Sequence, residues 1–279
     1  MFFDTHLHLI DMDRLEYPWL DEAPALRANA SYEDYSRTAR RVGITRTLHM
    51  EVDVAPAQQM AETEMVEELM ALPDSLICGA IASCRPENEE FPAYLEKVLQ
   101  RPAVRGLRRV LHVVPDEVSR QPLFRANINR LATTRLTFDM CFLARQLPIA
   151  AELADACPDV TFVLDHGGVP DIRGGDHANW ARDLRALAKR PNVIAKVSGF
   201  IAYADPDRWT LNDLRPYVET VIDAFGFERL VWGSDSPVVT LGGSIETWVA
   251  ATQALIADCS ARERALLTHE NAGKLWLAD

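Results

Sequence analysis

The chain has 279 residues, 48 % hydrophobic and 25 % charged, a composition typical of a globular protein with one large α/β domain or two smaller ones. Its formal net charge of −12 argues against nucleic acids and anionic membranes as partners, because both attract basic surfaces. Five scattered cysteines predict no disulfide framework, and neither a signal peptide nor a membrane-length apolar run is recognisable, so we expect a cytoplasmic protein.

Short apolar runs rich in β-branched and aromatic residues recur along the chain. They predict strands at 2–8, 45–52, 75–83, 104–111, 136–143, 160–166, 193–199 and 230–235. Amphipathic or capped stretches lie between most of these runs and predict helices at 31–43, 56–74, 148–159, 213–226, 245–260 and 261–267. Ser31 is placed as the cap of the first helix, and Pro73 ends the second.

Alternating strands and helices favour a parallel sheet, and strands this uniformly apolar indicate burial on both faces. Eight strand candidates in this length point to a (β/α)8 barrel that occupies residues 1–279 as a single domain. The alternative that the same pattern leaves open is a doubly wound open sheet. The long, acidic, proline-containing segment 10–31 is expected to fold over one mouth of the barrel.

Polar residues gather at the C-terminal ends of at least six of the predicted strands. Along the chain they are Asp4, His6, His8, His49, Glu51, Arg108, Arg109, Asp139, His166, Lys196, Ser198 and Asp235. In a barrel these ends form one rim, and active sites of this fold are built there. Core packing alone would not place charges at the same end of so many strands, so we predict a catalytic site at this rim.

Alternation along a strand refines these expectations. Asp4, His6 and His8 should share one face of the first strand, and a pair of imidazoles on one face favours a functional role. A buried Lys196 needs an acidic partner, for which Asp235 or Glu51 is the natural candidate.

Several of these polar residues also have plain structural interpretations. Arg108 and Arg109 point in opposite directions, so only one should enter the mouth. Asp165 and His49 are expected to be structural, and Asp235 could simply cap a turn. Cys141 is not expected to be a nucleophile, because no histidine partner can be argued for it.

Five motifs in fixed order carry a family resemblance. They are DTHLH at 4–8, VLDHGGVP at 163–170, AKVSG at 195–199, GSDSPV at 233–238 and ENAGKLW at 270–276. Together they resemble the amidohydrolase superfamily, and more narrowly its branch of sugar-lactone hydrolases, which YPWL (17–20), GLRRVLHVVPDE (106–117) and QLP (146–148) also fit. The resemblance spans nearly the whole chain and implies a barrel with hydrolytic chemistry at the strand C-termini.

The resemblance assigns catalytic positions to His6, His8, His166 and Asp235. In many members the first-strand histidines and the aspartate help to bind one or two divalent metals. This chain departs from that pattern, because its fifth strand offers Asp139 instead of a histidine and its fourth offers no lysine or glutamate. His6, His8 and Asp235 could still hold one zinc ion, completed by Glu51 or Asp139, whereas some relatives work without a metal.

These expectations combine into hydrolysis of a lactone, an internal ester of a sugar acid or similar acid. Asp235 would act as general base and the three histidines would polarise the carbonyl. The expected substrate-binding residues are Arg108, Arg109, Lys196, Ser198, Tyr203, Trp209, Trp19 and Glu51, with Lys196 also able to keep Asp235 ionised. The alternatives are a metal-dependent decarboxylase, a lactone isomerase and a non-catalytic sugar-acid binder. The only partner expected is a small-molecule substrate, and the sequence is compatible with a monomer or a homodimer.

Overall fold

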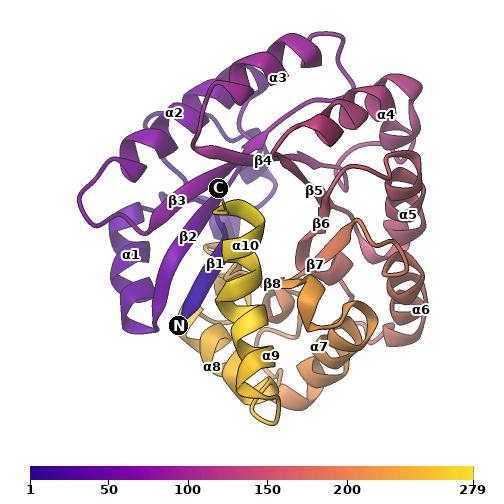
Figure 1. Cartoon of the computed structure of the whole chain (residues 1–279). Coiled ribbons are helices and arrows are strands. Elements are labelled where there is room, and N and C mark those ends of the chain that lie inside the picture. Colours follow the sequence, from indigo (N-terminus) through magenta and orange to yellow (C-terminus); the bar gives the residue numbers. More distant parts are fainter. Residues whose placement is uncertain (279) are drawn as a thin grey trace.

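A computed structural model, which describes residues 1–278, shows eight parallel strands in which each strand pairs with the next along the chain (Figure 1). The strands are β1 (Phe2–Leu7), β2 (Ile44–Met50), β3 (Ile77–Ser83), β4 (Val104–Val110), β5 (Thr137–Cys141), β6 (Phe162–Leu164), β7 (Val193–Val197) and β8 (Leu230–Trp232). A parallel bridge between Leu7 and Ser236 joins the first strand to the chain after the last. The sheet therefore closes into the predicted barrel, and the open-sheet alternative is wrong.

Helices cross over between successive strands and form the outer ring of the molecule in Figure 1. They are α1 (Tyr32–Arg41), α2 (Gln59–Met70), α3 (Phe91–Leu99), α4 (Pro122–Asn129), α5 (Leu147–Ala156), α6 (His177–Leu187), α7 (Leu211–Phe225), α8 (Ile245–Leu255), α9 (Ala261–Ala265) and α10 (Asn271–Trp276). Helices α3, α4, α6 and α10 were not among the sequence predictions. The Ser31 hydroxyl accepts the backbone N–H of Asp34, which confirms the predicted cap of α1.

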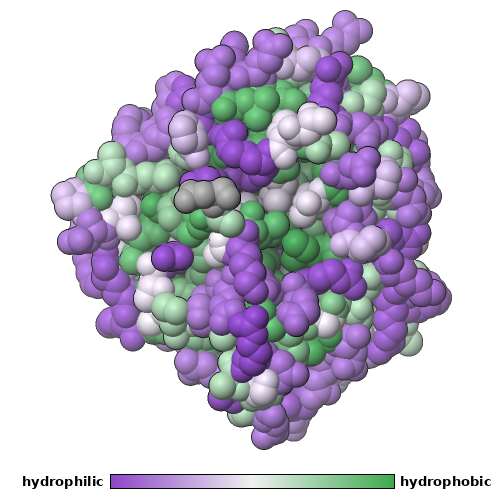
Figure 2. All heavy atoms as spheres, viewed as in Figure 1, coloured by the Kyte–Doolittle hydropathy of each residue, from purple (hydrophilic) through white to green (hydrophobic). Residues whose placement is uncertain are grey.

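The barrel interior is filled by apolar side chains, among them Phe3, Leu48, Ile81 and Val231. Helix α10 packs against this cluster, and the indole N–H of Trp276 donates to Thr137 Oγ1, at the first residue of β5, over 3.1 Å. This contact places α10 across the N-terminal end of the barrel, the face seen in Figure 1. In Figure 2 apolar spheres show between the polar residues around α10, while the periphery is mostly hydrophilic. The opposite end of the barrel is thus left for a site.

A bulge in β1 decides which of its polar side chains face inward. Asp4 pairs with Thr47 and Leu7 with His49, so three steps along β1 match two along β2. As a result the Asp4 carboxylate faces outward and accepts the Tyr35 hydroxyl of α1 at 2.7 Å, whereas His6 turns into the barrel. The prediction that Asp4 shares a face with the two histidines is therefore wrong, because simple alternation cannot see a bulge.

Strands β6 and β8 are shorter than predicted, so two expected strand residues lie in the turns that follow. His166 has φ of +53° and Asp235 has φ of +60°, a left-handed conformation that is uncommon outside glycine. The Asp235 turn is held from both sides, because its N–H donates to the His6 carbonyl at 2.9 Å and its carbonyl accepts Val239 N–H at 2.7 Å. Asp235 is therefore not the last residue of a strand, but its position is fixed by β1.

The segment 10–31 covers part of the C-terminal mouth, as predicted. Ile10 and Ala30 form an antiparallel bridge that closes the segment into a loop, and Trp19 and Leu26 project from it into the mouth. Among the described helices, none combines the length and the apolar character that crossing a membrane requires.

Candidate active site

A cavity of about 230 Å³ opens at the C-terminal mouth of the barrel. It is lined by His8, Ile10, Trp19, Leu26, Val52, Asp53, Arg108, Val110, His112, Val113, Cys141, His166, Tyr203, Asp235, Pro237 and Val238. The lining draws on the ends of most strands and on the 10–31 loop. It is the arrangement in which enzymes of this fold place their catalytic groups.

Asp235 lies at the floor of this cavity among three histidines. Its Oδ1 is 3.6 Å from His8 Nε2 and 3.8 Å from His6 Nε2, and its Oδ2 is 3.8 Å from His166 Nδ1. The Asp235 side chain is 1 % exposed, and its Oδ2 has no hydrogen-bond partner among the described residues. A buried carboxylate oxygen without a partner is rare, so Asp235 is poised to accept a hydrogen bond from water or substrate.

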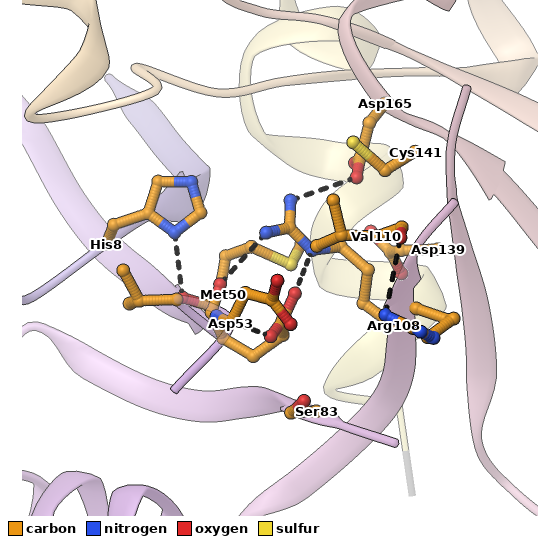
Figure 3. A network of polar contacts seen from close by, with 12 residues as sticks. His8, Met50, Asp53, Ser83, Arg108, Val110, Asp139, Cys141 and Asp165 are labelled. Carbon is orange, nitrogen blue, oxygen red and sulfur yellow. Dashed lines mark hydrogen bonds and ion pairs between the residues drawn. The ribbon is translucent and has the colours of Figure 1, made fainter. Parts of the chain in front are cut away.

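Neighbouring groups determine which ring nitrogen of His8 and of His166 carries the proton. His8 Nδ1 lies 3.0 Å from the Met50 carbonyl, which can only accept, so the proton of a neutral His8 sits on Nδ1 and the Nε2 lone pair faces Asp235 (Figure 3). His166 Nδ1 lies 2.9 Å from the Ser198 hydroxyl. If that hydroxyl donates, His166 carries its proton on Nε2. Burial lowers the pKa of His166 and keeps its ring neutral.

A network of buried charges lies beneath the cavity around Lys196. The Lys196 ammonium, fully buried, is 2.8 Å from Asp139, 3.0 Å from Asp165 and 3.0 Å from His6 Nδ1. Burial opposes its charge, but Asp139 and Asp165 outweigh burial and raise the pKa of Lys196. The partners predicted for Lys196, Asp235 and Glu51, are therefore wrong, and Asp165 takes a place beside the site.

Arg108 links the cavity to this network. Its Nε donates to Glu51 Oε1 at 2.6 Å, its Nη2 to the Glu51 carbonyl at 3.0 Å, and its Nη1 to Asp165 at 3.3 Å (Figure 3). Burial opposes ionisation of Glu51, but the Arg108 guanidinium lowers the pKa of that carboxyl and keeps it charged. Glu51 is thus a partner that orients Arg108 and does not line the cavity.

The remaining predicted residues divide between the cavity and other places. Trp19 and Tyr203 line it, whereas Lys196 and Ser198 lie buried behind the lining. Arg109 points away from the mouth, with its Nε donating to Glu87 at 2.9 Å. Trp209 donates its indole N–H to the Gly242 carbonyl at 2.7 Å and does not reach the cavity. Neither Arg109 nor Trp209 can contact a ligand bound beside Asp235.

Sequence reasoning missed two polar residues that line the cavity, Asp53 and His112, and Cys141, which was not expected to be a nucleophile, lines it as well. His112 Nδ1 lies 3.1 Å from Cys141 Sγ, so the expectation that Cys141 has no histidine partner is wrong. Burial nevertheless raises the pKa of the Cys141 thiol and lowers that of His112 to about 4, so the pair is neutral rather than an activated thiolate. Asp53 and His112 each follow a predicted strand, which is the signal that could have found them.

The depressed pKa of His112 predicts how its contribution to stability depends on pH. As the pH falls, His112 takes up a proton near pH 6.5 in the unfolded chain, but only near pH 4 in the folded protein. The stability contribution of the neutral ring is therefore present above pH 6.5 and is lost as the pH falls below it. Urea unfolding at pH 7 and pH 5 should show that wild type loses roughly 2 kcal/mol more than His112→Asn. Equal losses in the two proteins would contradict the assignment.

Gly199 packs against Asp235 and His166 and has a matched control elsewhere. A Cβ there would lie 2.7 Å from Asp235 Oδ2 and 2.8 Å from His166 Nδ1, whereas at Gly175 it meets nothing within 4 Å. Both glycines have similar φ, +73° and +76°, so alanine adds the same backbone strain, about 1–2 kcal/mol, at each. Gly175→Ala should keep its turnover while Gly199→Ala loses most of it, measured at a temperature where both stay folded. Equal turnover would mean that Gly199 does not constrain the site.

The donor atoms at the cavity floor fit one divalent ion. Ligand atoms of His6, His8 and Asp235 lie within 4.8 Å of one another, and the unpartnered Asp235 Oδ2 is an oxygen that an ion could use. Two imidazoles and a carboxylate with an open fourth position are typical of catalytic zinc. The set also has an opposing feature, because Arg108 Nη1 lies 3.3 Å from His6 Nε2. A guanidinium therefore already faces the nitrogen that an ion would need.

Comparison with known proteins gives a consistent result. The profile of the family described as amidohydrolase matches residues 3–277. An L-fucono-1,5-lactonase of Burkholderia ambifaria is 29 % identical over 242 residues, 86 % of this chain and 81 % of that protein. An L-fucono-1,5-lactonase of Burkholderia multivorans is 26 % identical, over 98 % of this chain and 95 % of that protein. Among solved structures, an amidohydrolase from Burkholderia multivorans with bound zinc superposes over the whole of both chains with a TM-score of 0.89 at 22 % identity.

Proposed function

The chain belongs to the amidohydrolase family, and from this premise we propose that it is a lactonase that opens a lactone ring with water at the C-terminal mouth of the barrel. The observation that carries the proposal is the Asp235 carboxylate, which is buried at the floor of the cavity and has one oxygen to which no residue from 1 to 278 donates a hydrogen bond. A base in this position can take a proton from a water molecule beside a bound carbonyl.

The proposed reaction has two steps. Asp235 accepts a proton from water while the water oxygen bonds to the lactone carbonyl carbon, which gives a tetrahedral intermediate with a negative oxygen. The intermediate then breaks its bond to the ring oxygen, which leaves as an alcohol after taking the proton back from Asp235. The product is a hydroxy acid, and one net proton appears in solution as the acid ionises.

Three lining residues supply the positive field for the negative oxygen. A neutral His166 with its proton on Nε2 and the Tyr203 hydroxyl are the donors that the cavity offers, with the Arg108 guanidinium behind them. In a neutral His8 the proton lies on Nδ1 beside the Met50 carbonyl and Nε2 can accept but not donate, so the proposed mechanism does not count this ring among the oxyanion donors. Removing one such donor typically costs about 100-fold or more in kcat.

A divalent ion held by His6, His8 and Asp235 would supply Lewis-acid polarisation of the carbonyl. The proposed steps use only groups of the chain, and Arg108 already places a positive charge beside His6 Nε2. We therefore predict that treatment with a chelator, followed by its removal, changes the rate of acid release by no more than about twofold, because fixed donors stabilise the oxyanion. A loss of activity that zinc restores would contradict this and would assign the ion an essential role.

The names of the two Burkholderia relatives make sugar-acid lactones the first substrates to test. Acid release, followed with a pH indicator, should be measured on five- and six-membered aldonolactones and on simple alkyl lactones. Turnover of any of them above the buffer rate supports the proposal. Release of carbon dioxide from an unsaturated acid would instead favour a decarboxylase, and ring migration without acid would favour an isomerase.

A further inference from the structure

The walls of the cavity are strongly apolar for a site that would hold a sugar. Eight of the lining residues are hydrocarbon in character, namely Ile10, Trp19, Leu26, Val52, Val110, Val113, Pro237 and Val238. They come from the 10–31 loop, from the last residue of β4 and from the chain after β2, β4 and β8, so apolar groups enter from several sides of the mouth. A sugar hydroxyl that lost water against such a wall would have no partner.

Most polar atoms in the lining are already engaged with the protein. The Trp19 indole N–H donates to the Val52 carbonyl at 2.7 Å, and His112 is paired with Cys141. Asp53 Oδ1 is held by Arg85 at 2.7 Å. Besides the groups that the proposed reaction needs, the lining side-chain atoms without a hydrogen bond among the described residues are His8 Nε2, Asp53 Oδ2 and His112 Nε2. Few are left to recognise a ring full of hydroxyls.

The charges of the cavity also oppose an anionic substrate. Among its lining residues the one permanent cation is Arg108, and three of its nitrogens are bound by Glu51, Asp165 and the Glu51 carbonyl. Arg109, the other candidate for binding a carboxylate, is turned away toward Glu87. A ligand carboxylate would therefore face Asp235 and Asp53 without a free guanidinium to pair with.

We propose that the substrate is a small, uncharged lactone whose ring bears a short hydrocarbon substituent, in preference to a polyhydroxylated sugar lactone or a lactone with a carboxylate. This inference rests on the proposed lactonase function and names its substrate class. The volume of about 230 Å³ suits a single ring with a short chain, because sites for drug-sized ligands measure roughly 300–1,000 Å³.

The test compares kcat/KM for three lactones, each divided by the uncatalysed rate at the same pH. The substrates are a δ-valerolactone with a propyl group beside the ring oxygen, D-glucono-1,5-lactone, and a lactone that bears a carboxylate. An apolar site discriminates against an added hydroxyl by roughly 10- to 100-fold, so the propyl lactone should exceed the gluconolactone by about 100-fold or more. A gluconolactone or carboxylate lactone within about tenfold of it, or above it, would overturn the inference and leave the lactonase function standing.

Two variants and a control test whether the apolar side chains of the cavity cause the preference for the propyl lactone. Val110→Thr and Val52→Thr add a hydroxyl at nearly constant volume, and each should lower the preference for the propyl lactone by about tenfold. The control is Leu72→Thr, because Leu72 is 47 % exposed and lies outside the cavity, so the preference should not change. An unchanged preference in both valine variants would show that the wall does not select the substrate.

Binding of lactams separates the substrate class from the reaction. A lactam replaces the ring oxygen by N–H and resists hydrolysis, so its affinity, measured by calorimetry, does not depend on catalysis. The propyl lactam should bind at least about tenfold more tightly than the lactam of gluconic acid. If no lactone is hydrolysed and this order still holds, the proposed reaction fails while the ligand class stands. Tighter binding of the hydroxylated lactam would overturn the ligand class.

Discussion

Replacing Asp235 by asparagine should lower kcat for lactone opening by roughly 1,000-fold, because a positioned general base contributes about 10²- to 10⁴-fold. Asparagine keeps the shape of the side chain but cannot take a proton from water. The Oδ2 of Asp235 has no hydrogen-bond partner in the described part of the chain, so the fold should tolerate the change. Acid release by the purified variant, with circular dichroism to confirm folding, measures this effect.

A matched control removes the same charge elsewhere. Asp207 is exposed and its carboxylate accepts no hydrogen bond from residues 1–278, so Asp207→Asn should leave kcat unchanged. If Asp235→Asn keeps its activity within about tenfold of wild type, Asp235 is not the base, and the mechanism proposed for the cavity fails.

Replacing Lys196 by methionine should destabilise the protein by about 3–5 kcal/mol, the range measured when one partner of a buried ion pair is removed. The ammonium is fully buried and contacts both Asp139 and Asp165. Without this ammonium, the Asp139 and Asp165 carboxylates stay buried in the barrel, and no other cation among residues 1–278 lies as close to them as Lys196 does. Urea unfolding of the folded variant gives the free energy directly.

Two further variants make the result specific to this network. Lys274 is 63 % exposed and lies 3.9 Å from Glu270, so Lys274→Met should cost less than about 1 kcal/mol. Adding Asp139→Asn to Lys196→Met should restore part of the stability, because it removes one unpaired charge. A loss that is equal in the two lysine variants, or that Asp139→Asn deepens, would mean that Lys196 does not neutralise these carboxylates.

The barrel and the end of the barrel that carries the site followed from simple sequence rules. Eight apolar runs with helical stretches between them predicted the fold, and the polar residues at strand ends predicted the rim. His6, His8, His166 and Asp235, first selected by position and resemblance, do come together at one cavity floor. Their catalytic roles stay predictions until the variants are measured.

The errors have local physical causes. A bulge in β1 turned Asp4 outward, and alternation gives no sign of an extra residue. Lys196 pairs with Asp139 and Asp165 instead of Asp235. Which side chains meet inside a barrel depends on how far along its own strand each residue lies, and the sequence does not give that height. The pairing of His112 with Cys141 joins the ends of two adjacent strands, a contact that exists only once their register is set.

Ring opening in water enriched in oxygen-18 tests the central claim most directly. Mass spectrometry of the product from a six-membered lactone should show one labelled oxygen, located in the carboxylate, at a rate well above that of buffer. That result requires attack of water on the carbonyl carbon. Label in the alcohol, an isomeric lactone without label, or carbon dioxide as product would contradict the account and show that the cavity performs different chemistry.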